Sequence, residues 1–216
     1  MTYNCPLRFL EFKEAYIDKM MEYNGLKIES CDRVYAPSED TLLLAENLKS
    51  RPDDYVLEIG TGTGFIALAA SLKTKKVVAT DINPYAVNCA RENLKINNIP
   101  NMEVRPGDLF KPVKGEKFDL IIFNTPYLPS SEDEIIGDEL DAAWNGGIDG
   151  RKVIDAFLDE LKDYLCKKGR IQLVQSSLSD NKKTLEKLEN MGFESEITAM
   201  ERFFFEEVVV ISAELK

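Results

Sequence analysis

The sequence contains no histidine, and this absence excludes several kinds of active site. Without imidazole there is no Ser-His or Cys-His nucleophilic pair, and few side chains remain that hold a catalytic zinc ion. Any acid-base step must therefore be carried out by other groups. We expect no metal site.

Long apolar segments and paired cysteines are missing as well. No apolar run reaches the roughly 18 residues of a membrane span, and Met1 to Leu10 lacks the pattern of a signal peptide. We therefore expect a cytoplasmic protein with no membrane segment. The four cysteines lie far apart without CxxC spacing, which argues against a zinc ribbon and favours reduced thiols: Cys5, Cys31, Cys89 and Cys166.

Basic residues are outnumbered by acidic ones, 27 against 38, which gives a net charge of −11. This charge repels a phosphate backbone at long range, so a nucleic-acid partner is disfavoured although a local basic patch would restore it. Solubility and the steering of a partner both explain the charge. The length of 216 residues suits one α/β domain. We expect a catalytic domain over residues 40–216, preceded by a capping segment over residues 1–39.

The capping segment begins with an amphipathic stretch. Its apolar residues recur at helical spacing, which predicts packing rather than a cofactor site: Phe9, Phe12, Tyr16 and Met20. Residues 26–35 then have the composition of short strands.

From residue 40 onward, apolar runs of strand length alternate with helical patterns. Helices are expected at 65–72, 84–96, 150–165 and 180–190. Seven strands are expected, at 55–59, 76–80, 102–105, 118–123, 170–175, 194–199 and 204–213. The alternation predicts an α/β fold with a mainly parallel sheet and helices on both faces. The last two strands leave no room for a helix between them, so the final strand should be antiparallel.

A glycine-rich turn, with the sequence EIGTGTG, follows the first of these strands. Gly60, Gly62 and Gly64 allow a tight turn and close approach of a ligand, although a purely structural turn has the same pattern. The spacing is GxGxG rather than the GxGxxG of dinucleotide-binding sites, and Glu58 would repel a pyrophosphate. A carboxylate there suits an ammonium group, which favours S-adenosylmethionine over a nicotinamide cofactor.

Two further acidic positions follow the next two strands. Asp81 is placed to accept from both ribose hydroxyls of a nucleoside. Asp108 is placed to accept from the adenine amine, and Leu109 to pack on the ring. Each residue alone reads equally well as a helix cap or a surface residue, but their places at successive strand ends favour one cofactor site.

The fourth strand runs into the tetrapeptide NTPY, formed by Asn124, Thr125, Pro126 and Tyr127. With the preceding motifs, it resembles the N-x-P-Y signature of amino-methyltransferases and, more closely, the HemK family. The resemblance covers nearly the whole chain from Val34 onward. It implies a Rossmann-like class I methyltransferase that uses S-adenosylmethionine and methylates the glutamine of the Gly-Gly-Gln loop in a peptide chain release factor.

The chemistry of an amide explains this tetrapeptide. An amide nitrogen is a poor nucleophile, so it needs positioning more than deprotonation. The Asn124 side-chain oxygen and the Thr125 carbonyl can each accept one N–H, and Tyr127 can stack on the planar amide. Most family members have proline where this chain has Thr125. The carbonyl acceptor survives that change, but the rigidity of proline is lost.

Two other segments resemble the compact archaeal and eukaryotic branch of the family. In VYAPSEDT, residues 34–41, the resemblance implies that Thr41 contacts the cofactor and that the acidic pair helps to shape the site; Ser38 also suits a helix start. In AWNGGIDGR, residues 143–151, Trp144 suits a substrate entrance or a packed lid. Because only residues 1–39 precede the catalytic domain, we expect this chain to resemble the compact branch, without the helical recognition domain of bacterial members. The branch implies a small zinc-binding activator subunit as partner.

Three other functions fit some of these residues less well. A nucleic-acid amino-methyltransferase would present the same tetrapeptide to an adenine or guanine amine, but the acidic balance argues against it. A non-catalytic scaffold would not need every cofactor and catalytic position. A nicotinamide oxidoreductase would leave the NTPY loop without a purpose.

Overall fold

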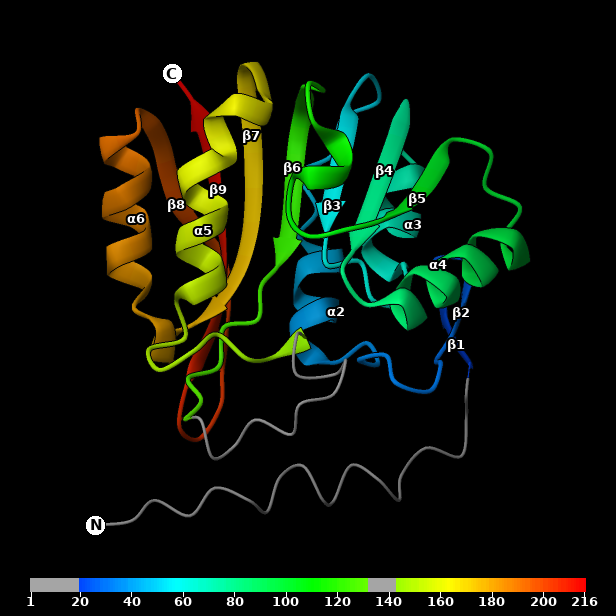
Figure 1. The fold of residues 1–216 in the computed structure, drawn as a ribbon, viewed down its shortest axis with the longest axis horizontal. Coiled ribbons are helices and arrows are strands. Elements are labelled where there is room, and N and C mark those ends of the chain that lie inside the picture. The colour runs from blue at the N-terminus through cyan, green and yellow to red at the C-terminus, as the bar shows by residue number, and fades with distance from the viewer. Residues whose placement is uncertain (1–19, 132–142) are drawn as a thin grey trace.

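The computed structural model describes residues 20–131 and 143–216, and a seven-stranded sheet forms its centre (Figure 1). The spatial order is β5-β4-β3-β6-β7-β9-β8. In this sheet β9 alone runs opposite in direction to the other six strands, which confirms the predicted topology. The strands are β3 Tyr55–Ile59, β4 Lys76–Asp81, β5 Met102–Pro106, β6 Phe118–Asn124, β7 Leu165–Ser176, β8 Phe193–Arg202 and β9 Glu207–Leu215.

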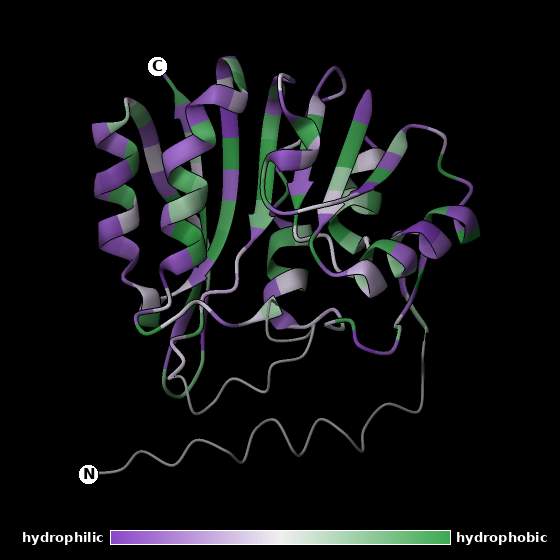
Figure 2. Cartoon of the chain, viewed as in Figure 1, coloured by the Kyte–Doolittle hydropathy of each residue, from purple (hydrophilic) through white to green (hydrophobic). Residues whose placement is uncertain are grey.

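Helices cover both faces of the sheet because alternate strand residues are apolar on each side. One apolar cluster joins the sheet to α2 Glu39–Glu46, α3 Phe65–Ser71 and α4 Pro84–Ile96. The other joins it to α5 Lys152–Glu160 and α6 Asn181–Asn190. Figure 2 shows the apolar strands inside and polar residues on the outer sides of α4 and α6. Among the described helices, none is long and apolar enough to cross a membrane.

Within residues 20–131 and 143–216, three short 3-10 helices lie in the connections: η1 Lys111–Val113, η4 Leu161–Tyr164 and η5 Ser177–Ser179. The predicted helix over 150–165 is therefore a shorter α5 followed by η4. The other three predicted helices lie within one residue of their expected ends.

A separate hairpin precedes α2. Strands β1 Met20–Tyr23 and β2 Leu26–Glu29 pair antiparallel around Asn24 and Gly25, both with positive φ. An Asn-Gly pair is a strong hairpin signal, because this turn needs left-handed backbone at both positions. Met20 thus lies in a strand and not on the expected helical stripe, and Phe9, Phe12 and Tyr16 fall outside the described residues.

The cysteines correct one expectation. Cys31 and Cys89 form a disulfide, with their Cα atoms 6.0 Å apart, whereas Cys166 is a free thiol. The expectation of reduced thiols was therefore wrong for this pair. The two residues are 58 positions apart, and only the packing of the β1–β2 segment against α4 brings them together. Spacing alone carries no signal for such a contact.

Removing this disulfide should lower the free energy of unfolding by about 2–4 kcal/mol, because the crosslink restricts the unfolded chain. The test is chemical denaturation of C31S/C89S beside the wild type. Cys166→Ser, which removes only the free thiol, should unfold at the wild-type midpoint. Equal stability of C31S/C89S and the wild type would show that the crosslink contributes nothing.

Candidate active site

The two central strands bring the glycine turn and the NTPY loop side by side. Ile59 lies opposite Phe123 in the parallel pair β3–β6, so Gly60 and Asn124 follow at the same edge. A side-chain carbon at Gly60 would come within 3.2 Å of the Phe123 ring and 4.0 Å of the Asn124 carbonyl oxygen. The sheet reverses its strand order at this point, where open α/β sheets bind their ligands.

The glycine turn depends on backbone that other residues rarely adopt. Gly62 has φ 56°, and its N–H donates to Asp81 Oδ2 at 2.8 Å. Gly64 has φ 85° and precedes α3, where a side-chain carbon would come within 3.1 Å of Ala90 Cβ. The turn is therefore held close to both α4 and the end of β4.

Two buried carboxylates flank this turn. Glu58 accepts from the Thr61 hydroxyl and, at 3.1 Å, from the Ala67 N–H; burial raises its pKa to about 8. Burial also raises the pKa of Asp81, although its oxygens accept from backbone N–H groups, including that of Asn83 at 2.8 Å. Within residues 20–131 and 143–216, neither carboxylate is ion-paired with a lysine or arginine. A ligand that donates from an ammonium or hydroxyl group fits such a pair.

The third acidic position lies in the neighbouring loop. The Gly107 N–H donates to the Asp81 carbonyl at 2.8 Å, which joins the loop after β5 to the end of β4. Asp108 lies there, partly exposed and ion-paired with Lys111 at 2.8 Å. Leu109 has φ 45° and packs against the sheet. The sequence did not indicate the ion pair between Asp108 and Lys111. A ligand that bound Asp108 would compete with Lys111 for its carboxylate.

The side-chain amide of Asn124 is hydrogen-bonded through its nitrogen but not, within the described residues, through its oxygen. Its Nδ2 donates to Asp40 Oδ2 at 3.1 Å, whereas its buried Oδ1 has no hydrogen-bond partner among the described residues. Buried amide oxygens are normally paired, so an orphan one at the edge of a site points to a donor on a ligand.

Asp40 connects α2 to the NTPY loop. Its Oδ2 also accepts from the Tyr127 hydroxyl at 3.3 Å, and its Oδ1 accepts from the Thr41 N–H at 2.6 Å and hydroxyl at 3.1 Å. Ser38 caps α2, and its N–H donates to the Thr41 hydroxyl at 3.3 Å. Of the acidic pair that the sequence indicated, Asp40 is buried against the loop and Glu39 is exposed.

Thr125 and Tyr127 are fixed by different means. The Thr125 hydroxyl and N–H donate to the Val174 carbonyl at 2.7 and 3.3 Å, which ties the loop to β7. A proline here would make neither bond, so threonine restrains the loop in another way. Tyr127 lies between both apolar clusters, and burial raises the pKa of its hydroxyl, with the Asp40 charge adding to the rise.

The glycine-rich segment after residue 143 packs on this loop. The Leu128 N–H donates to the Trp144 carbonyl at 3.1 Å, and Trp144 is half-buried. A side-chain carbon at Gly146 would come within 2.6 Å of the buried Pro126 carbonyl oxygen. Arg151, which the sequence did not single out, is buried and donates to the Ser179 carbonyl at 2.6 Å. Its burial results from tertiary packing, and no pattern in the sequence indicates it.

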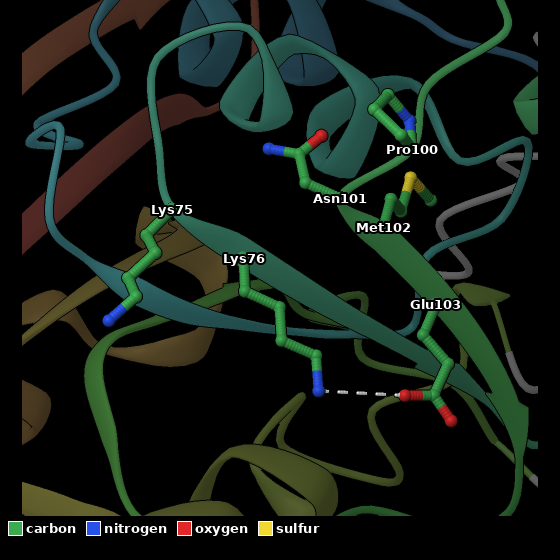
Figure 3. A pocket seen from close by; sticks show the side chains of 6 residues that line it. All are labelled: Lys75, Lys76, Pro100, Asn101, Met102 and Glu103. Atoms are coloured by element: carbon green, nitrogen blue, oxygen red, sulfur yellow. Dashed lines mark ion pairs between the residues drawn. The ribbon is translucent and has the colours of Figure 1, made fainter.

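One surface hollow lies away from these residues. Figure 3 shows its lining side chains, which belong to the starts of β4 and β5 and the residues before them: Lys75, Lys76, Pro100, Asn101, Met102 and Glu103. Asp81 and Gly107 lie at the other ends of these strands. The hollow is therefore separate from the candidate site.

Comparisons with known proteins find similar methyltransferases. Residues 35–142, half of the chain, match the family model described as the methyltransferase small domain. A putative protein N5-glutamine methyltransferase of Methanocaldococcus jannaschii is 49% identical over 195 residues, covering 90% of this chain and 98% of that protein. The human methyltransferase HEMK2 is 33% identical over 180 residues, covering 78% and 83% respectively.

Solved structures show the same fold. The E. cuniculi Mtq2-Trm112 complex, described as responsible for methylation of the translation termination factor eRF1, contains a chain that is 29% identical with a TM-score of 0.65. The match covers 85% of this chain and 99% of that one. The M. jannaschii tRNA m1G37 methyltransferase matches at 20% identity with a TM-score of 0.66, covering 91% and 56%, and this likeness concerns the fold alone.

Proposed function

The chain belongs to the HemK family of methyltransferases, and from that premise we propose that it methylates the side-chain amide nitrogen of a glutamine in a peptide chain release factor. The methyl donor is S-adenosylmethionine. The acceptor is the glutamine of the Gly-Gly-Gln loop, and the enzyme works in the cytoplasm. The names of the similar glutamine methyltransferases support this substrate class.

The chemistry of the side chains fits this cofactor. Glu58 and Asp81 are buried carboxylates, and neither has an ion pair in the described part of the chain. S-adenosylmethionine offers two kinds of hydrogen-bond donor: Glu58 suits its ammonium group and Asp81 suits its ribose hydroxyls. Asp108 would accept from the adenine amine, and Leu109 would pack on the ring. Bound S-adenosylmethionine supplies an electrophilic methyl group. The remaining proposed cofactor residues are Thr41, Gly60, Gly62, Gly64 and Asn124.

The NTPY loop would orient the acceptor amide. The single observation that carries this proposal is the buried, unpartnered Asn124 Oδ1. It would accept one amide N–H and the Thr125 carbonyl would accept the other, which aims the nitrogen at the methyl group. Tyr127 would stack on the planar amide, and Pro126 would shape the pocket and help to exclude water.

Asp40 would position the Asn124 amide. In Asp40→Asn, an amide that keeps its oxygen on the Thr41 N–H turns its NH₂ group toward Asn124 Nδ2, so donor faces donor there, whereas the Tyr127 hydroxyl can still pair by accepting. We expect kcat to fall by at least about tenfold, the equivalent of one lost hydrogen bond to a charged group. Cofactor affinity should change much less.

Single-turnover kinetics and calorimetric titration of the cofactor measure these two effects. Glu39→Gln is the matched control, because it alters the exposed neighbour and should leave kcat unchanged. Unchanged turnover in Asp40→Asn would remove the positioning role. A parallel loss of cofactor affinity and turnover would assign Asp40 to cofactor binding instead.

A radiolabelled methyl-transfer assay tests the proposed substrate. Wild-type release factor, its Gln→Ala loop variant and total RNA are offered separately to the purified chain. Label in the wild-type factor alone is expected. Label in RNA would favour the nucleic-acid alternative, and equal label in both factors would reject the loop glutamine as acceptor.

A small zinc-binding subunit is the proposed partner of the enzyme. The similar E. cuniculi structure is a complex of two proteins, in which Mtq2 is joined to Trm112. The same transfer assay, run with and without an added small zinc-binding subunit, checks the proposal. Activation is expected, and equal rates in both reactions would contradict it.

A further inference from the structure

Three apolar side chains are far more exposed than the others in the described residues. Ile148, Phe204 and Phe205 are 87%, 86% and 81% exposed, whereas the other exposed large apolar side chains there reach 57% at most. The two phenylalanine rings contact each other edge to face, with centroids 4.6 Å apart. Single exposed apolar residues are ordinary, but a group in one place indicates an interaction surface.

The three side chains lie on loops at the same edge of the sheet as the NTPY loop. Ile148 lies in the connection that follows β6, and the phenylalanine pair lies in the turn between β8 and β9. In Figure 1 this turn and the loop after β6 both lie below the sheet. The same edge carries η5 after β7, where Leu178 is 49% exposed. We call Ile148, Leu178, Phe204 and Phe205 the apolar rim.

Direct contacts join the loops of the apolar rim to the NTPY loop. A side-chain carbon at Gly150 would come within 2.4 Å of the Tyr127 carbonyl oxygen and 3.0 Å of Ser179 Cβ. On the far side of η5, the Ser177 hydroxyl accepts from the Glu207 N–H at 3.0 Å. The loops that carry the apolar rim are therefore packed one against the next from Tyr127 to the β8–β9 turn.

The apolar rim and most of the proposed cofactor residues lie at different strands of this edge of the sheet. Apart from Thr41 in α2 and Asn124, the proposed cofactor residues end or follow β3, β4 and β5, whereas the rim follows β6, β7 and β8. Asn124 ends β6, the strand next to β3, and so lies at the boundary. Phe203, next to the phenylalanine pair, packs in the same apolar cluster as Tyr127. A substrate protein that inserts a side chain toward Asn124 from the side opposite the cofactor residues would therefore contact the apolar rim.

We infer that the apolar rim is the docking surface for the folded protein that carries the methyl-accepting glutamine; this inference rests on the proposed function. A protein surface suits it better than RNA. Glu201, Glu206 and Glu207 flank the phenylalanine pair, and Arg202 is ion-paired with Glu207 at 2.9 Å. Aromatic platforms for nucleic-acid bases lie in basic grooves, which this turn does not provide.

Kinetics of F204S/F205S on two acceptors tests the inference. For whole release factor, kcat/KM should fall by about tenfold or more, as for central apolar residues of an interface. For a short peptide with the same glutamine, kcat/KM should stay at the wild-type value, because the peptide does not reach the turn. Leu72→Ser is the matched control: Leu72 is 47% exposed but follows α3, near the start of β4.

Equal kcat/KM of F204S/F205S and the wild type on release factor would overturn the inference. An equal fall on factor and peptide would also overturn it, because the turn would then act on the pocket. If F204S/F205S loses self-association in sedimentation but keeps its kcat/KM on release factor, the rim binds a second copy of the chain. If the variant loses only RNA binding, the rim binds RNA.

A binding measurement separates this inference from the proposed function. Asn124→Ala is immobilised with and without the F204S/F205S changes, and release factor is passed over both surfaces. Weaker binding to the combined variant supports the rim whether or not turnover occurs. If the wild type binds release factor through the rim but methylates another residue, the proposed acceptor fails and the docking surface stands. Equal binding to both surfaces removes the docking surface.

Discussion

Asn124→Ala should lower kcat by about 100- to 1,000-fold, the cost of removing one preorganised polar group from an active site. The buried Oδ1 of Asn124 has no partner in the described structure, and its Nδ2 is held by Asp40. The substitution removes the acceptor for one amide N–H while the Thr125 carbonyl remains. The acceptor nitrogen is then no longer oriented toward the methyl group, so turnover falls in addition to any loss of affinity for the substrate.

Single-turnover methylation and calorimetric cofactor titration separate these effects. The dissociation constant of the cofactor should change by no more than about threefold, because Asn124 is only one of several proposed cofactor contacts and the carboxylates that hold the ammonium and hydroxyl groups are untouched. Asn190→Ala is the control, since it removes an exposed amide at the end of α6. Equal losses of turnover and cofactor affinity would contradict the assigned role of Asn124.

Glu58→Gln should weaken cofactor binding by roughly 30- to 1,000-fold, the equivalent of about 2–4 kcal/mol for losing one partner of a buried charge pair. Glutamine keeps an oxygen for the Thr61 hydroxyl and the Ala67 N–H, so the turn can retain its shape. What disappears is the negative charge opposite the proposed ammonium group.

The pH dependence of cofactor affinity tests the role of Glu58 independently. Because burial raises the pKa of Glu58 to about 8, this carboxyl is protonated at neutral pH in the ligand-free protein. Binding an ammonium group requires the carboxylate and therefore releases a proton. Affinity should rise by up to about tenfold per pH unit as pH approaches about 8 from below.

Calorimetry in two buffers with different ionisation enthalpies measures this proton release. Glu58→Gln should abolish it, whereas Glu92→Gln, an exposed carboxyl paired with Lys95, should retain it. The same shift lowers the stability of the ligand-free protein as pH rises from about 4.5 through about 8, because the folded state binds the extra proton. Proton release that is identical in Glu58→Gln and the wild type would exclude Glu58 as the ammonium partner.

Much of the architecture follows from local patterns in the sequence. The runs that form β3, β4 and β6 are largely apolar because both faces of these strands are buried, and α4 has Pro84 at its start. The motifs could be placed at one edge of the sheet, since the carboxyl ends of parallel strands meet there. The glycine turn and the NTPY loop are adjacent for this reason.

Contacts between distant segments could not be predicted in this way. Asp40 and Asn124 are 84 positions apart, and α2 brings them together only after it packs on the sheet. The Cys31–Cys89 disulfide depends likewise on how the β1–β2 segment lies on α4. The Thr125 hydroxyl finds the Val174 carbonyl only because β6 and β7 are paired. In each case the partner is set by tertiary packing, which leaves no periodic signal.

Tandem mass spectrometry of the reaction product tests the central claim most directly. Release factor is incubated with the enzyme and S-adenosylmethionine, digested, and the modified residue is located by fragmentation. We expect one added methyl group on the side-chain nitrogen of the Gly-Gly-Gln glutamine, and no added methyl with Asn124→Ala enzyme at the same reaction time. A methyl group on lysine, on another residue or on co-purified RNA, with the loop glutamine unmodified, would contradict the proposed function.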